Sequence, residues 1–272
     1  MTSIYFRPGF ERGFGTWPLK GDELRASLEA ALEAGYRAID TAQLYGNEAE
    51  VGAVLNASGI ARDELCVTTK VDPAHFGEDD FIASVERSVE ALGGAPDVLL
   101  LHWPPEDMAI EAPLERLAEA RRRGLTREIG VSNFTRAMLV RAGEVIGDPI
   151  ACNQIEFHPL IDQSAMLAAA TETGIPLTAY CALARGKFTD HPEFAAIGEA
   201  HGKSAAQIVS RWILQKGVAV NAMSTKERNI RANFDVMDFT LSSIEMARID
   251  ALGATGYRIV ATGPYGIAPD WD

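Results

Sequence analysis

Short apolar runs alternate with longer amphipathic stretches along the whole sequence, and this alternation limits the folds open to the chain. The runs are rich in β-branched or aromatic residues and mostly lack polar alternation. They cover residues 14–17, 37–41, 65–70, 97–102, 128–132, 151–156, 176–181 and 218–223. Such runs are typical of strands buried on both faces of a parallel sheet. Strands that alternate with helices form a barrel or a doubly wound sheet.

The stretches between the runs have the periodicity of helices. Residues 23–34 place Leu24, Leu28 and Leu32 on one face and stop before Gly35, a residue suited to a helix C-terminus. The same pattern predicts helices over 23–34, 80–92, 113–123, 136–145, 163–173 and 204–215. No linker interrupts the 272 residues, a length that suits one barrel of about 250 residues. We therefore expect residues 1–272 to form a single (β/α)8 TIM barrel.

The last segment, residues 253–272, is rich in Gly, Pro and aromatic residues, and we expect it to be a loop over the active site. The net charge of −13 argues against a nucleic-acid-binding surface, which needs a basic face. No apolar run approaches the roughly 18 residues of a membrane helix. Cys66, Cys152 and Cys181 have no metal-ligand spacing, so we expect no metal, reduced thiols and a cytoplasmic setting.

Polar residues stand at the ends of several predicted strands, where packing gives them no role. They are Asp40, Lys70, His102, Ser132, Asn133, Gln154 and Tyr180. In a barrel the active site lies at the C-terminal ends of the strands. One charged strand end is more often part of a loop ion pair, but several such groups at successive strand ends indicate a site.

Four of the residues at or near these strand ends fit the chemistry of carbonyl reduction, which needs a hydride donor and an acid that protonates the developing alkoxide. Tyr45 is the candidate acid, but its reference pKa near 10 is too high for easy transfer at neutral pH. The Lys70 ammonium would lower that pKa, and Asp40 would hold the ammonium in place. His102 would orient and polarise the carbonyl group.

Six motifs resemble those of the aldo-keto reductase family, in the family's order and approximate spacing. They are GFGTWPLKG (13–21), AIDTAQLYGNE (38–48), VTTKV (67–71), LLLHWP (99–104), IGVSNF (129–134) and NQIEFHP (153–159). The resemblance extends from about residue 10 to the end and is close to bacterial reductases of the 2,5-diketo-gluconate reductase kind. It implies a barrel that binds a nicotinamide dinucleotide, with Asp40, Tyr45, Lys70 and His102 as the catalytic tetrad.

The resemblance also implies a set of cofactor contacts. Ser132, Asn133 and Gln154 would bind the nicotinamide carboxamide, and Tyr180 would stack on its ring. The segment Gly15, Thr16 and Trp17 would approach the nicotinamide. The loop 178–188, similar to the family's pyrophosphate loop, adds Leu183, Arg185 and Gly186. Asn233 matches an asparagine near the adenine.

The adenosine 2′-phosphate site departs from the family pattern. Met223 and Asn229 stand where related reductases usually place basic residues. A basic cluster nonetheless follows, and Ser224 and Thr225 precede a predicted helix N-terminus, which attracts phosphate. The predicted phosphate-binding residues are Ser224, Thr225, Lys226 and Arg228. We therefore expect NADPH as cofactor, with NADH as the alternative.

Aromatic residues make up the predicted substrate pocket, namely Trp17, Phe76, Trp103 and Trp271, next to Tyr45. No arginine stands out as a carboxylate clamp, which favours an aldehyde or a neutral ketone as the small-molecule carbonyl substrate. Nothing in the sequence requires an oligomer, and we expect a monomer.

Two other functions remain open at this point. The same fold serves as a cofactor-binding regulatory subunit, as in the β-subunits of potassium channels. A barrel lyase or isomerase could instead use Lys70 as a Schiff base. The second alternative leaves the motifs around Tyr45, Ser132 and Gln154 unexplained.

Overall fold

The computed structural model describes residues 3–188 and 190–272, and its strands close into a parallel barrel in the order β1 to β8. Within these residues the strands are β1 (Arg12–Gly15), β2 (Ala38–Asp40), β3 (Cys66–Val71), β4 (Val98–Leu101), β5 (Glu128–Ser132), β6 (Asn153–Glu156), β7 (Leu177–Tyr180) and β8 (Ala219–Ala222). Each strand pairs with the next, and β8 pairs with β1. The predicted (β/α)8 barrel is confirmed, and the doubly wound sheet is excluded.

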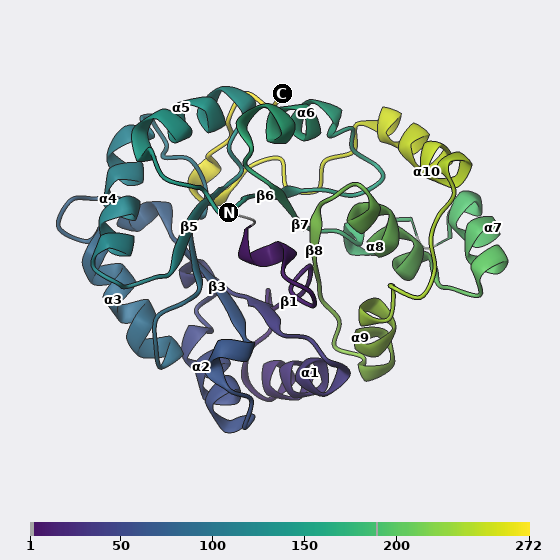
Figure 1. Ribbon diagram of the computed structural model, residues 1–272, viewed down its shortest axis with the longest axis horizontal. Coiled ribbons are helices and arrows are strands. Elements are labelled where there is room, and N and C mark those ends of the chain that lie inside the picture. The colour runs from purple at the N-terminus through teal and green to yellow at the C-terminus, as the bar shows by residue number, and fades with distance from the viewer. Residues whose placement is uncertain (1–2, 189) are drawn as a thin grey trace.

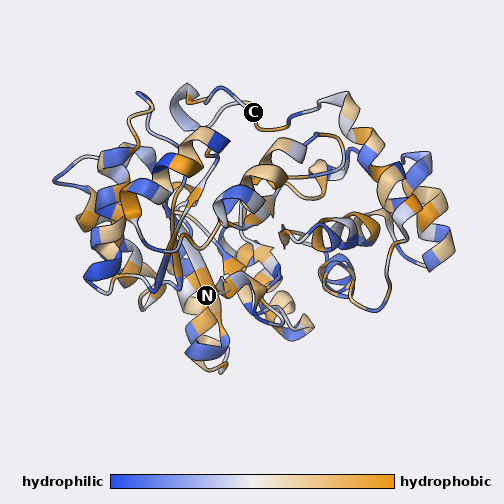
Figure 2. Cartoon of the chain, turned by 45° about the horizontal axis from the view of Figure 1, so that its top comes forward, coloured by the Kyte–Doolittle hydropathy of each residue, from blue (hydrophilic) through white to orange (hydrophobic). Residues whose placement is uncertain are grey.

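The helices form a ring outside the strands (Figure 1). In the described residues they are α1 (Gly21–Ala34), α2 (Glu48–Ala57), α3 (Phe81–Leu92), α4 (Glu111–Arg122), α5 (Arg136–Ile146), α6 (Ser164–Thr173), α7 (Pro192–His201), α8 (Ala205–Gln215), α9 (Glu227–Phe234) and α10 (Ser243–Asp250). The outer helices carry both hydrophobic and hydrophilic residues (Figure 2). Their apolar faces pack against the outward-facing strand residues, for example Leu24 and Leu28 of α1 against Phe14.

The first strand lies two residues earlier than the predicted run 14–17. Phe14 packs outward, so its neighbours Gly13 and Gly15 face the barrel interior. A Cβ atom on Gly13 would lie 2.1 Å from Oδ1 of Asn221 on β8, its partner in the strand register. The missing side chain therefore makes room for Asn221. An apolar pattern cannot reveal a strand whose inward residues have no side chains.

A short N-terminal turn closes the bottom of the barrel. Residues Ile4–Phe6 form a 3-10 turn that lies over the middle of the barrel in Figure 1. The Tyr5 ring is buried among the first residues of several strands, including Val98 and Ala219, and its hydroxyl lies 2.6 Å from Oγ1 of Thr68. The interior is thus filled from below, and the open end lies at the C-terminal ends of the strands.

Candidate active site

A cavity of about 350 Å³ opens at the C-terminal ends of the strands, and most of the predicted site residues meet there. The predicted residues that line it are Gly15, Trp17, Asp40, Tyr45, His102, Trp103, Ser132, Asn133, Gln154, Tyr180, Leu183 and Arg185. They come from different strands, so barrel closure brings them together. The wall also includes Leu44, Asn221 and tail residues such as Val260, which the sequence did not single out.

Lys70 is fully buried on β3 and does not itself line the cavity, but it contacts Asp40 and Tyr45, which do. Its Nζ atom donates to Oδ1 of Asp40 at 2.6 Å and to the Thr41 carbonyl at 2.9 Å. Nζ also lies 3.4 Å from the Tyr45 hydroxyl. One ammonium group therefore contacts both the carboxylate and the phenol, as the sequence predicts for an activated tyrosine.

The charges follow from this geometry. Burial alone lowers the pKa of Lys70, but Asp40 and Tyr45 outweigh it and raise that pKa, so the ammonium stays charged. Burial raises the pKa of Tyr45, and Lys70 offsets part of this rise. Tyr45 is therefore a neutral phenol at physiological pH, with its proton available and a cation beside the oxygen that would lose it.

His102 follows β4 and faces Tyr45, with the ring centroids 5.6 Å apart. Burial lowers the pKa of its imidazole well below the usual value, and Lys70 lowers it further. The ring is therefore neutral. Its Nδ1 atom is buried and has no hydrogen-bond partner in the described part of the chain. A neutral imidazole at the cavity wall can act as a hydrogen-bonding group toward a carbonyl compound.

A hydrogen-bonded row joins the predicted nicotinamide residues. The Tyr180 hydroxyl donates to Oδ1 of Asn133 at 2.8 Å, and Nδ2 of Asn133 donates to Oγ of Ser132 at 3.1 Å. Oγ of Ser132 in turn donates to the Gln154 carbonyl at 2.8 Å. Gln154 crosses the barrel to Asp40, with its Nε2 atom 2.7 Å from Oδ2. The row thus connects the amide side chains to the Lys70 cluster.

Two residues next to Tyr45, which the sequence analysis missed, hold its turn in place. Asn47 is buried and accepts a hydrogen bond from Thr41 at 2.6 Å, while its Nδ2 atom donates to the Leu19 carbonyl at 3.0 Å. The Gln43 side chain accepts from the Asp72 backbone at 2.9 Å. Both residues belong to the motif AQLYGNE, so polar side chains inside a turn were the available signal.

Several predicted residues do not line the cavity. Thr16 is buried and its hydroxyl donates to the Asp40 carbonyl at 3.0 Å. Phe76 packs on Phe81 instead. Trp271 lies behind the wall, with its ring centroid 6.0 Å from that of Trp103. Gly186 closes the 3-10 turn Ala184–Gly186 and is also outside the lining.

The predicted phosphate residues lie beyond the cavity rim, where Met223 leads from β8 toward α9. Oγ of Ser224 accepts from the Lys226 backbone at 3.2 Å, and Thr225, Lys226 and Arg228 are exposed. Within the described residues, no ion pair or hydrogen bond engages the side chain of Lys226 or Arg228. Asn233, the predicted adenine neighbour, is buried in α9.

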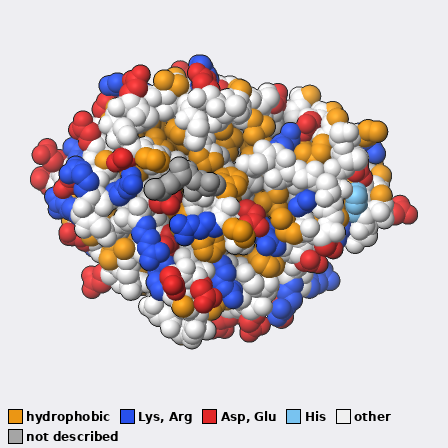
Figure 3. Space-filling model, in the orientation of Figure 1, with side chains coloured by type: hydrophobic (Ala, Val, Ile, Leu, Met, Phe, Trp, Pro, Cys, Tyr) orange, Lys and Arg blue, Asp and Glu red, His pale blue; other side chains and the backbone are white. Residues whose placement is uncertain are grey.

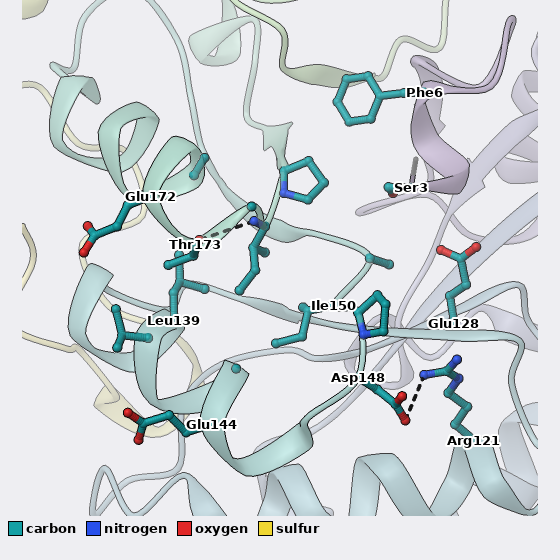
Figure 4. Close-up of a pocket in the computed structure, with 18 residues that line it drawn as sticks. Ser3, Phe6, Arg121, Glu128, Leu139, Glu144, Asp148, Ile150, Glu172 and Thr173 are labelled. Carbon is teal, nitrogen blue, oxygen red and sulfur yellow. Dashed lines mark hydrogen bonds and ion pairs between the residues drawn. The ribbon is translucent and has the colours of Figure 1, made fainter. Parts of the chain in front are cut away.

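A larger cavity of about 790 Å³ lies at the opposite end of the barrel, between α5 and α6 and beside Phe6 (Figure 4). Figure 3 shows apolar side chains gathered near the centre of that face. Its charged residues include Arg121, which pairs with Asp148 at 3.5 Å, and none of the predicted site residues reaches it. The smaller cavity is lined by the predicted catalytic residues Asp40, Tyr45 and His102 and is the candidate active site.

Known proteins resemble this chain over most of its length. The profile of the Aldo/keto reductase family matches residues 12–254. Methylglyoxal reductase DkgB of Escherichia coli O157:H7 is 39% identical over 264 residues, which cover 96% of this chain and 98% of the relative. A crystal structure described as a 2,5-diketo-D-gluconic acid reductase B is 40% identical, with a TM-score of 0.93 over 100% of this chain and 98% of that one.

An aldo-keto reductase of Bombyx mori, solved in complex with NADP, is 28% identical and has a TM-score of 0.88 over 100% of this chain and 97% of that one. No helix in the described residues is long and apolar enough to cross a membrane. The family resemblance of the sequence motifs is therefore confirmed. The chain belongs to the aldo/keto reductase family of oxidoreductases, which reduce carbonyl groups with a nicotinamide cofactor.

Proposed function

We propose that this enzyme uses NADPH to reduce a small aldehyde or ketone, with Tyr45 as the proton donor. The observation that carries the proposal is the position of the Lys70 ammonium, 2.6 Å from Asp40 and 3.4 Å from the Tyr45 hydroxyl. This arrangement favours a tyrosine that gives up its proton during the reaction, because the phenolate is stabilised as it forms.

Each of these residues has a distinct role in the proposal. When bound, the nicotinamide supplies the hydride that adds to the carbonyl carbon. Tyr45 donates its proton to the carbonyl oxygen, and Lys70 stabilises the phenolate that remains. Asp40 keeps Lys70 in place. The neutral imidazole of His102 orients the carbonyl oxygen toward Tyr45.

The cavity residues suit a nicotinamide group. Asn133 and Gln154 offer donors and acceptors that a carboxamide can use, and the Tyr180 ring lies in the same wall. A cavity of about 350 Å³ accommodates the nicotinamide end and a small carbonyl compound. The adenosine end of the cofactor would then extend past Met223 toward α9.

Preference for NADPH rests on Lys226 and Arg228, whose charges have no acidic partner in the described residues. Arg231, by contrast, pairs with Glu227 at 2.9 Å and with Glu33 at 3.2 Å. Arg228→Ala and Lys226→Ala should each reduce the ratio of kcat/KM for NADPH over NADH, on the order of tenfold. Arg231→Ala is the matched control and should leave the ratio unchanged. A wild-type preference for NADH would overturn this part of the proposal.

A small and largely apolar carbonyl compound suits the cavity wall, which contains Trp17, Trp103 and Leu44. Because one relative is named as a methylglyoxal reductase, methylglyoxal is the first substrate to test. The assay should include neutral aldehydes, ketones and keto acids, each with both cofactors. Activity confined to keto acids would contradict the proposed substrate class.

We further propose that the protein acts as a monomer in the cytoplasm. The large exposed apolar residues are scattered, for example Val140 on α5, Met237 in the loop between α9 and α10, and Ile244 on α10. Cys66 and Cys152 are buried free thiols, as expected in a reducing compartment. Size-exclusion chromatography with light scattering tests the oligomeric state, and a stable dimer would contradict it.

A further inference from the structure

The C-terminal tail, residues 253–272, forms part of the wall of the active-site cavity. Val260, Thr262, Gly263 and Pro264 all line it. A Cβ atom on Gly263 would lie 2.4 Å from the Trp103 ring, so the tail backbone rests directly on that side chain. Nearly all of the tail lies beyond residue 254, where the family match ends. Hydrogen bonds from the barrel hold the tail in place.

Glu156 provides that attachment. It ends β6 two residues after Gln154, which places both side chains on the inner face of the strand. Its carboxylate is fully buried and does not line the cavity. Oε1 accepts a hydrogen bond from the backbone N–H of Ile259 at 2.6 Å, and Oε2 accepts from the N–H of Val260 at 2.8 Å. One side chain thus binds two consecutive tail amides next to the cavity wall.

His158 completes the attachment. Its Nε2 atom lies 2.7 Å from Oε1 of Glu156, and its Nδ1 atom accepts from the backbone N–H of Leu160 at 3.3 Å. Since Nδ1 is an acceptor, the proton is on Nε2, and a neutral imidazole donates to the carboxylate. Burial raises the pKa of Glu156, but the hydrogen bonds from His158, Ile259 and Val260 outweigh it and lower that pKa. The carboxylate is therefore ionised with three N–H donors.

The loop that carries His158 holds the tail at a second point. The Leu160 carbonyl accepts from the Tyr257 backbone at 2.8 Å and from the Thr255 hydroxyl at 2.6 Å. The contacts therefore bracket the tail from Thr255 to Val260. Beyond Val260, contacts of the tail with the barrel include the packing of Gly263 and Trp271 on Trp103.

We propose that Glu156 is a positioning residue for substrate specificity: by fixing the amides of Ile259 and Val260, it sets the distance between the tail and Trp103. The cavity is thereby kept small, and small carbonyl compounds are favoured over bulky ones. The proposal rests on the carbonyl reductase function argued above.

The main test compares Glu156→Gln with the wild type. The amide keeps Oε1 as an acceptor but places an NH2 group against the N–H of Val260, so one bond is lost and two donors face each other. We expect KM for methylglyoxal to rise on the order of tenfold, and KM for a bulky aromatic aldehyde to stay level or fall. The kcat values and the NADPH Kd should change by less than about twofold, since the tetrad is untouched.

Trypsin gives a readout that does not depend on activity. Arg258 precedes the attached amides, and its side chain is packed over the Trp271 ring at 3.9 Å. Release of the tail should speed cleavage after Arg258 several-fold, as measured by mass spectrometry of the shortened chain. Val260→Pro removes one N–H donor and leaves Glu156 in place, so it tests the same contact if Glu156→Gln does not fold.

Glu245→Gln is the matched control, because Glu245 also binds a histidine, His201 at 2.8 Å, and a backbone amide, that of Ser242 at 2.7 Å, but far from the cavity. It should leave both KM values and tail cleavage unchanged. Folded Glu156→Gln and Val260→Pro proteins with wild-type KM values and wild-type trypsin cleavage would overturn the proposal. If the wild type reduces no carbonyl compound, the proposed function fails, while the trypsin comparison still tests the attachment.

Discussion

At the scale of single residues, the central feature of the site is one buried cation beside a carboxylate and a phenol. Lys70 has no exposed surface, and its charge is balanced by Asp40 and directed at Tyr45. The sequence allowed these groups to be predicted because each stands at a strand end within a recognisable motif. It did not allow the bond between Gln154 and Asp40 to be predicted, since these residues are 114 positions apart and meet only when the barrel closes.

Tyr45→Phe tests the proton donor directly. The change removes the hydroxyl and leaves the ring, so kcat should fall by about 10²- to 10⁴-fold, while the Kd for the cofactor stays within about twofold. Stopped-flow reduction and fluorescence titration measure the two quantities. Tyr257→Phe, an exposed tyrosine of the tail, is the matched control. Reductase activity retained in Tyr45→Phe would refute the assigned role.

His102 should make the protein less stable in mild acid. Its pKa is lowered by burial and by Lys70, whereas the unfolded chain has a histidine pKa near 6.5. Below pH 6.5 the unfolded state therefore binds a proton that the folded state does not bind. The free energy of unfolding should fall by about 1.4 kcal/mol between pH 7.5 and 5.5 from this residue alone.

Urea unfolding of the wild type and of His102→Gln at both pH values isolates this contribution, because all other titrating groups are shared. The variant should lose less stability on acidification by that amount. Equal losses in the two proteins would mean that His102 is protonated in the folded state.

At the scale of elements, the sequence analysis did not predict helices α2 and α10. In α2, the residue that would normally cap the helix has another structural role. Helix α2 follows Asn47, a residue type that often caps helices, but the Asn47 side chain binds Thr16 and Leu19 and makes no cap bond. The usual start signal is therefore used to hold the Tyr45 turn. Helix α10 does begin with a capping box, Ser242 with Glu245, so the sequence does contain a start signal for this helix.

Asn47→Ala should uncouple the Tyr45 turn from the loop after β1. It removes a buried group that bonds to Thr41 and to the Leu19 carbonyl, so the free energy of unfolding should fall by about 2 kcal/mol. The kcat should also fall, since Tyr45 would be less well placed, with little change in cofactor Kd. Asn56→Ala, on the exposed face of α2, is the control. A stable variant with wild-type kcat would show that the turn carrying Tyr45 keeps its conformation without the hydrogen bonds of Asn47.

At the scale of the whole molecule, one end of the barrel carries the candidate active site and the other end contributes to stability. The C-terminal ends of the strands carry the polar cluster, whereas the N-terminal ends are closed by an apolar layer around Tyr5. The sequence predicted the first arrangement from strand-end residues. The N-terminal ends are closed by the 3-10 turn Ile4–Phe6, a three-residue element for which the sequence patterns gave no signal.

Tyr5→Ala should therefore separate stability from catalysis. The ring is 3% exposed and its hydroxyl lies 2.6 Å from Thr68, so its removal leaves a cavity at the barrel bottom and should cost about 3–5 kcal/mol of unfolding free energy. The folded fraction should retain wild-type kcat/KM, because Lys70 and Tyr45 lie at the other end. Phe6→Ala, a less buried neighbour in the same turn, should cost less. Urea unfolding measures the free energy of unfolding, and steady-state kinetics at low temperature measure kcat/KM. A loss of kcat/KM in fully folded Tyr5→Ala would mean that packing at the bottom of the barrel also positions the catalytic groups.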